Sequence, residues 1–81
     1  MGYHVATIHK GAYGEFSKLE EEWAELCDAH FQGARVLELC ELADLVGAIE
    51  GYVRQHFDMD LSDILKMMEM TREAFESGER K

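Results

Sequence analysis

Two pairs of acidic residues are spaced so that each pair shares one face of a helix. Glu22 and Glu25 lie three residues apart, and so do Glu41 and Asp44. Residues at this spacing have Cβ atoms about 5–6 Å apart on a helix. Carboxylate oxygens are hard ligands that suit Mg²⁺ or Mn²⁺. If the two helices face each other, the four carboxylates can converge on a divalent cation.

The second pair lies in the most apolar part of the chain. Within residues 39–53 the charged side chains are Glu41, Asp44 and Glu50, and residues 36–53 contain no Lys or Arg. A buried carboxylate without a counter-charge is costly and tends to become neutral. A bound cation is the simplest compensation. The alternative is that this face of the helix opens to solvent.

Three helices are predicted to carry these groups, over roughly 17–31, 35–56 and 60–77. Along the first, apolar or aromatic side chains recur at intervals of three or four residues, which is typical of one buried helix face. These side chains are Phe16, Leu19, Trp23, Leu26 and His30. The second helix is apolar on nearly every side, as is typical of a central, buried helix.

The ends of the first helix also have recognisable signals. Ser17 and Glu20 fit a capping box at its start, and Gly33 suits a left-handed end.

Short connections make successive helices antiparallel. Residues 1–15 have no sustained period and contain three glycines, which predicts a short extended N-terminal arm with a turn. The predicted fold class is all-α: an antiparallel helical hairpin plus a third helix, in one domain over residues 1–81.

Composition excludes several classes of protein. The 81 residues include 8 Lys+Arg and 17 Asp+Glu, for a net charge of −9, and 47% are hydrophobic. The hydrophobic content predicts a folded core. The negative charge argues against binding nucleic acid or an anionic membrane. Since there is no apolar run of about 18 residues and no signal-peptide pattern, we expect a cytoplasmic protein.

The short length predicts assembly. A chain of this size buries only about 60% of its unfolded surface. Cys27 and Cys40 do not make a disulfide framework, and their apolar surroundings favour free thiols. We therefore expect a homodimer or homotetramer in which a second copy completes a four-helix-type bundle.

The acidic motifs resemble a known family. EEEWAEL at 20–26 and ELADL at 41–45 resemble the EExxE…ExxD signature of the MazG-like all-α nucleoside triphosphate pyrophosphohydrolases. GEFSKLEEEWAELCDAHFQ, ELADLVGAIEGY and the tail TREAFESGER are similar to its short, often phage-encoded branch, over residues ~10–80. The resemblance implies a dimer or tetramer that hydrolyses nucleoside or deoxynucleoside triphosphates to the monophosphate and pyrophosphate with Mg²⁺, for which Mn²⁺ is the alternative ion.

The resemblance also implies roles for particular residues. The metal ligands of the family fall on Glu22, Glu25, Glu41 and Asp44. Glu21 and Glu22 become the catalytic acids, with Glu21 helping to hold the attacking water or a second ion. The alignment of the second family motif with this sequence has an alternative, since Glu38 and Glu41 also form an ExxE pair. The pair of Glu41 and Asp44 is preferred because the family motif ends in Asp.

The chain has few positively charged residues that could bind the phosphates of a substrate, so the candidates are limited. The resemblance of the tail favours Arg72 and Arg80 for the phosphates, with Lys10 and Lys18 as further candidates. Trp23 is a candidate for contacting the base. For each of these residues the alternative is a structural one, either a solvated charge or, for Trp23, a place in the core. The four histidines, His4, His9, His30 and His56, have no partner spacing and are expected to be solvated or to pack.

Two other functions compete with hydrolysis. Residues 58–69 put acidic or hydroxyl side chains at positions 1, 3, 5 and 12 of an EF-hand calcium loop. Position 6, however, is Asp63 where the loop needs glycine, and the following ILKMMEM continues as helix. The other alternative is a non-catalytic helical interaction module on the same fold.

Overall fold

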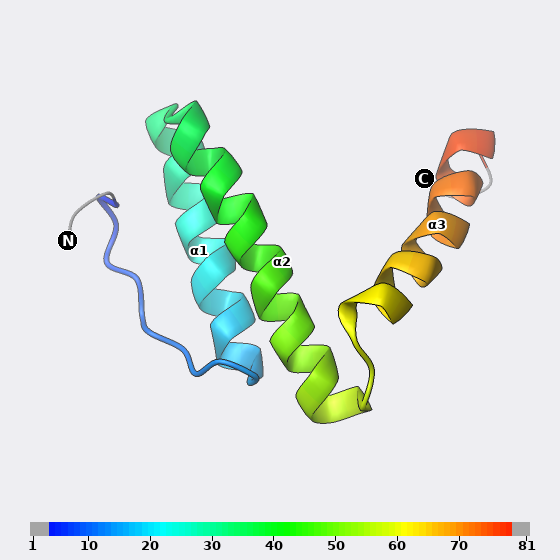
Figure 1. Cartoon of the computed structure of the whole chain (residues 1–81). Helices are drawn as coiled ribbons and strands as arrows, with labels where there is room; N and C mark the ends of the chain where they lie inside the picture. Colours follow the sequence, from blue (N-terminus) through cyan, green and yellow to red (C-terminus); the bar gives the residue numbers. More distant parts are fainter. Residues whose placement is uncertain (1–3, 79–81) are drawn as a thin grey trace.

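The computed structural model of the chain describes residues 4–78 and contains, within that range, three helices and no strand (Figure 1). The helices are α1 (Phe16–Gln32), α2 (Arg35–Phe57) and α3 (Leu61–Ser77). α1 and α2 run antiparallel side by side, and α3 stands away from them (Figure 1). The all-α class is confirmed, and each observed helix end lies within one residue of its predicted position.

The start of α1 differs from the sequence prediction, whereas its end agrees with it. Gly33 ends the helix in the left-handed conformation, with φ 72°, and its N–H donates to Ala29 and His30. The predicted capping box at Ser17 is wrong. The N-cap is Glu15, without a side-chain cap, and the Ser17 hydroxyl instead accepts from the Ala12 N–H at 3.1 Å. The segment before α1 therefore supplies the donor that this hydroxyl accepts.

A reciprocal capping box does occur at the start of α3. The Asp60 carboxylate accepts from the Asp63 N–H at 3.2 Å, and the Asp63 carboxylate accepts from the Asp60 N–H at 3.0 Å. Because α3 begins at Leu61, most of residues 58–69 are helical. This segment therefore lacks the open twelve-residue loop that an EF-hand needs.

The cap of α3 is expected to weaken in acid. Hydrogen bonds from the Ser62 hydroxyl and the Asp63 N–H lower the pKa of Asp60 from its ordinary value of 3.8. A lowered pKa means that the stabilisation is present above 3.8 and is lost as the pH falls through the folded-state pKa. The protection factors of the Asp63 and Ile64 amides against hydrogen exchange should fall over that range. Asp60→Asn, which caps without titrating, should remove this pH dependence, and its persistence in that variant would contradict the assignment.

The buried layer of the hairpin contains acidic side chains beside a few small apolar ones. Four acids are 3–6% exposed: Glu21, Glu22, Asp28 and Glu41. Phe16 and Trp23, expected in the core, are instead 57% and 59% exposed. In the single chain, residues 4–11 lie over the acidic flank of α1, and nothing within residues 4–78 covers the Phe16 and Trp23 side chains to the same extent.

The single chain also leaves much of α2 and α3 uncovered. Leu42 and Val46 of α2 are 44% and 46% exposed, and α3 has no buried residue. The expectation that α2 is buried on all sides is therefore wrong for one chain. The radius of gyration is 14.6 Å, against about 12 Å for a compact domain of this length. Within residues 4–78, no helix has the length and apolar character needed to span a membrane.

Candidate metal centre

Four carboxylates from α1 and α2 meet between the two helices. Glu22, Glu25, Glu41 and Asp44 each offer one oxygen, and these oxygens all lie within 4.8 Å of one another. Glu22 and Glu41 are each 5% exposed, whereas Asp44 is exposed. The antiparallel hairpin thus brings together the two pairs that the spacing indicated. The cluster is closed on the side of Glu22 and Glu41 and open at Asp44.

Two buried oxygens of this cluster lack a hydrogen-bond partner among the described residues. They are Oε1 of Glu22 and Oε1 of Glu41. A buried acceptor without a donor costs about 1–3 kcal/mol, and more when it is charged. A cation between the carboxylates would satisfy both atoms. The donor set, all carboxylate oxygens, fits Mg²⁺ or Mn²⁺.

The electrostatics of the cluster also favour a cation. Burial raises the pKa of Glu22, and the charges of Glu25 and Asp44 raise it further, although Lys18 opposes them. Burial and the neighbouring Glu41 raise the pKa of Glu25. Like charges at this distance disfavour the ionised form of both groups. A cation between these carboxylates would therefore favour the ionised forms of Glu22 and Glu25.

His4, on the segment before α1, reaches the same cluster. Its Nε2 lies 3.0 Å from Oε2 of Glu41 and 4.0 Å from Oε1 of Glu25. Its Nδ1 lies 2.8 Å from Oδ2 of Asp28. Burial lowers the pKa of His4, but the hydrogen bonds to Asp28 and Glu41 outweigh it, and the pKa is raised. Neither His4 nor Asp28 was singled out from the sequence.

Asp28 fixes the backbone beside His4. Its carboxylate accepts from the Val5 N–H at 3.0 Å, the Ala6 N–H at 3.1 Å and the Gln32 amide at 2.8 Å. Burial raises the pKa of Asp28, but these hydrogen bonds and the contact with His4 outweigh it and lower the pKa. Its position three residues after Glu25 was the sequence signal that it shares that flank of the helix.

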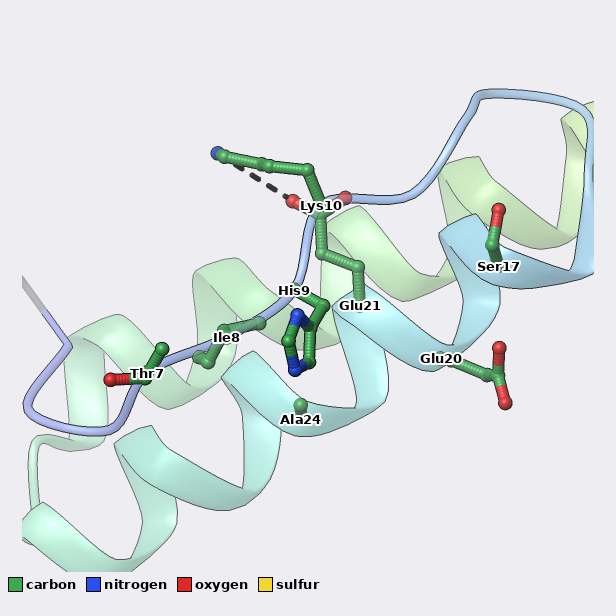
Figure 2. Close-up of a pocket in the computed structure, with 8 residues that line it drawn as sticks. All are labelled: Thr7, Ile8, His9, Lys10, Ser17, Glu20, Glu21 and Ala24. Carbon is green, nitrogen blue, oxygen red and sulfur yellow. Dashed lines mark ion pairs between the residues drawn. The ribbon is translucent and has the colours of Figure 1, made fainter.

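Glu21 points away from the four-carboxylate cluster and towards the N-terminal residues. Figure 2 shows its side chain extending from α1 to Lys10, with a 3.7 Å contact between Oε2 and Nζ. Its Oε1 accepts from the Gly11 N–H at 2.8 Å and from Lys18 at 3.1 Å. Burial raises its pKa, but the bonds from Gly11 and Lys18 outweigh it and lower the pKa. Glu21 thus anchors residues 10 and 11 to α1.

The predicted substrate-binding residues are dispersed. Lys18 contacts the cluster, with Nζ 3.2 Å from Oε2 of Glu22. Arg72 pairs with Glu69 at 3.2 Å on α3, the helix that stands away from the hairpin. Arg80 lies outside the described residues. Trp23 lines two hollows on the apolar flank of the hairpin.

Gly11 is expected to be essential for the anchoring of residues 10 and 11 to α1 by Glu21. A Cβ at Gly11 would lie 2.2 Å from the carbonyl oxygen of Ser17 and 2.6 Å from the backbone nitrogen of Lys18. Since backbone atoms cannot move aside, Gly11→Ala should displace residues 4–12 and cost about 1–3 kcal/mol. Urea unfolding and hydrogen exchange of the Val5 and Ala6 amides measure both effects.

The matched control is Gly47→Ala in α2, where a Cβ would meet nothing within 4 Å. It should be neutral or stabilise by up to about 1 kcal/mol through helix propensity. Equal stability of the two variants would contradict the close approach at Gly11.

Comparison of the chain with protein-family models, with curated proteins and with solved structures gives no match. The family hypothesis therefore depends on the two acidic motifs and the tail, and the site must be argued from its own geometry.

Proposed function

We propose that the chain is a Mg²⁺-dependent nucleoside triphosphate pyrophosphohydrolase that converts a nucleoside or deoxynucleoside triphosphate to the monophosphate and pyrophosphate. The observation that carries the proposal is the meeting of four carboxylates within 4.8 Å, two of them with buried, unpartnered oxygens. The resemblance of residues 20–26 and 41–45 to the MazG-like signature assigns the ligand role to the same four side chains. Chemical geometry and motif therefore support one assignment.

The residues of the cluster divide the work of such a reaction. Mg²⁺, or Mn²⁺ in its place, would supply positive charge for phosphate oxygens and make a bound water more acidic. The exposed Asp44 leaves one side of the cluster open for the phosphates. Glu22, one of the two catalytic acids that the resemblance implies, is the group proposed to accept a proton from the attacking water, because burial raises its pKa and so makes it a stronger base.

Positive charge for the substrate comes first from Lys18, which touches the cluster. Lys10 lies next, with a side chain that is 88% exposed and free to turn from Glu21 towards a phosphate. A role for Arg72 requires that α3 of this chain or of a second copy lies over the site, and a role for Arg80, outside the described residues, stays a prediction. A second-ion or water-holding role for Glu21 remains a prediction, since its oxygens are engaged by Gly11 and Lys18.

A homodimer or homotetramer is part of the proposal. The chain exposes 6143 Å², about 1,200 Å² more than a compact monomer of its mass. A typical interface buries about 800 Å² on each partner. The uncovered apolar side chains of α1 and α2, among them Trp23 and Leu42, supply such a face. A second hairpin packed there would complete a four-helix core.

A panel of nucleoside and deoxynucleoside triphosphates tests the activity. Pyrophosphate, not orthophosphate, should appear with Mg²⁺ and cease with a chelator. Glu41→Gln and Asp44→Asn should each lower the rate at least about 100-fold, since loss even of outer-shell partners of a metal costs 10–100-fold. Unchanged rates in both variants would refute the metal assignment, and absence of release from every nucleotide would refute the enzyme.

The non-catalytic interaction module is favoured by a different observation, the large exposed apolar side chains on all three helices. On that hypothesis the acidic cluster is a relic or a structural cation site. Tight binding of a protein partner together with no Mg²⁺-dependent hydrolysis would select it.

A further inference from the structure

We propose that His4 is a nitrogen ligand of this metal centre and that Asp28 is its orienting partner. The segment before α1 would then complete the site rather than merely cover it. The inference rests on the proposed metal site and deepens it by adding one imidazole on the side of Glu25 and Glu41, the two carboxylates that His4 shares with the cluster. The evidence for this inference is the position of the His4 side chain, which belongs to neither acidic motif.

The donor atoms of His4 are placed as neighbouring ligands would be. A ligand atom of His4 lies within 4.8 Å of carboxylate oxygens of Glu25 and Glu41, two residues that also belong to the four-carboxylate group. The 3.0 Å between Nε2 and Oε2 of Glu41 matches the edge of about 3 Å between adjacent donors in an octahedral site with 2.1 Å bonds. The unpartnered Oε1 atoms of Glu22 and Glu41 remain available in the same cluster.

Asp28 gives the imidazole the orientation that a metal ligand requires. It contacts Nδ1 at 2.8 Å, so a proton on Nδ1 is held there and Nε2 faces the carboxylates, where a bound cation would replace the hydrogen shared with Glu41. Metal-binding histidines almost always donate their second ring nitrogen to a carboxylate, carbonyl or water. The Val5 and Ala6 N–H groups and the Gln32 amide hold the Asp28 carboxylate in place.

An imidazole ligand changes which metals the centre prefers. Carboxylates and water suit Mg²⁺, whereas imidazole suits Zn²⁺ and other transition metals. The affinity for Zn²⁺ should therefore depend on His4 more strongly than the affinity for Mg²⁺ does. His9, which is exposed on the same segment, provides a matched control.

Calorimetry with Zn²⁺ and with Mg²⁺ alone, without nucleotide, tests the inference. His4→Gln should weaken Zn²⁺ binding about 10–100-fold, with Asp28→Asn also weakening it and His9→Gln leaving it unchanged. Nitrogen NMR of the wild-type histidines should show Zn²⁺ shifting Nε2 of His4 while Nδ1 keeps its proton. Protection of the Val5 and Ala6 amides checks that this segment stays docked in His4→Gln.

The outcomes separate the inference from the proposed function. Unchanged or tighter Zn²⁺ binding in His4→Gln, together with an Nε2 signal that zinc does not move, would show that His4 only covers the site. The four-carboxylate centre would survive that result. If the wild type binds neither metal, the centre itself is refuted, and His4 with it.

Discussion

Glu25→Gln is expected to make the metal-free protein more stable and the Mg²⁺-saturated protein less stable than the wild type. The Glu25 side chain is 17% exposed, and its ion pair is a 4.0 Å contact with His4. Burial and Glu41 raise its pKa, so ionised Glu25 opposes folding when no cation is bound. An amide of the same shape removes that charge, and with it one ligand of the metal.

The pH dependence of this effect has a defined sign. A carboxyl with a raised folded-state pKa makes the wild type lose stability as the pH rises from the ordinary value of 4.5 through the folded pKa. The advantage of Glu25→Gln without metal should therefore be present at neutral pH and absent below pH 4.5. Mg²⁺ at 100 times its dissociation constant should then stabilise the wild type by about 2.7 kcal/mol, and the variant by much less.

Thermal unfolding with Mg²⁺ and with a chelator measures the stability of Glu25→Gln relative to the wild type with and without the metal. Glu20→Gln is the matched control, since Glu20 lies on the same helix but is exposed and outside the cluster. Its unfolding should respond to Mg²⁺ as the wild type does. Loss of stability in Glu25→Gln without metal, or an equal response to Mg²⁺ in all three proteins, would contradict a cation site at these carboxylates.

The sequence was informative about this cluster because helical spacing alone decides which side chains share a face. Glu22 with Glu25, and Glu41 with Asp44, needed only two helices and a tight connection at Gly33 to be brought together. His4 could not be predicted in the same way. It reaches Glu41 from 37 residues away because Asp28 and Glu21 bind the backbone of an irregular segment, and no periodic pattern encodes such a path.

The apolar residues were harder to place for a different reason. The stripe through Phe16 and Trp23 correctly predicted a helix, since its spacing is helical, but not what covers it. Apolar periodicity indicates that a helix face is buried, but it does not indicate whether the residues that cover this face belong to the same chain. The Ser17 hydroxyl is a similar case. A serine whose spacing fits a helix cap can instead accept a hydrogen bond from another segment, and here it accepts from the Ala12 N–H.

Leu42→Lys is expected to dissociate the proposed assembly and to lower its stability severely. Leu42 is 44% exposed in the single chain and lines a hollow with Trp23 and Leu26. In a monomer a lysine there would extend into water, with an effect within about 0.5 kcal/mol. Buried against a second copy, each lost leucine costs about 1.5–3 kcal/mol, and a symmetric interface contains the change twice.

The two cases differ enough for one experiment to separate them. A loss of at least about 3 kcal/mol raises the dissociation constant more than about 100-fold, so Leu42→Lys should be monomeric at micromolar concentrations where the wild type is dimeric or tetrameric. Light scattering and the concentration dependence of the melting temperature measure this. Val5→Lys is the control, because Val5 is 82% exposed and lies before α1, away from that hollow.

A wild-type mass of 9.3 kDa at micromolar concentration, unaffected by Leu42→Lys, would contradict the assembly. The metal centre would then have to be stable on a lone hairpin, in which the buried apolar side chains among residues 4–78 are Ala29, Ala48 and Val53. Such a hairpin would depend on the cation for much of its folding free energy, as small metal-binding domains do. Chelation would then unfold the monomer, whereas in the assembled protein chelation should abolish hydrolysis and leave the helices folded.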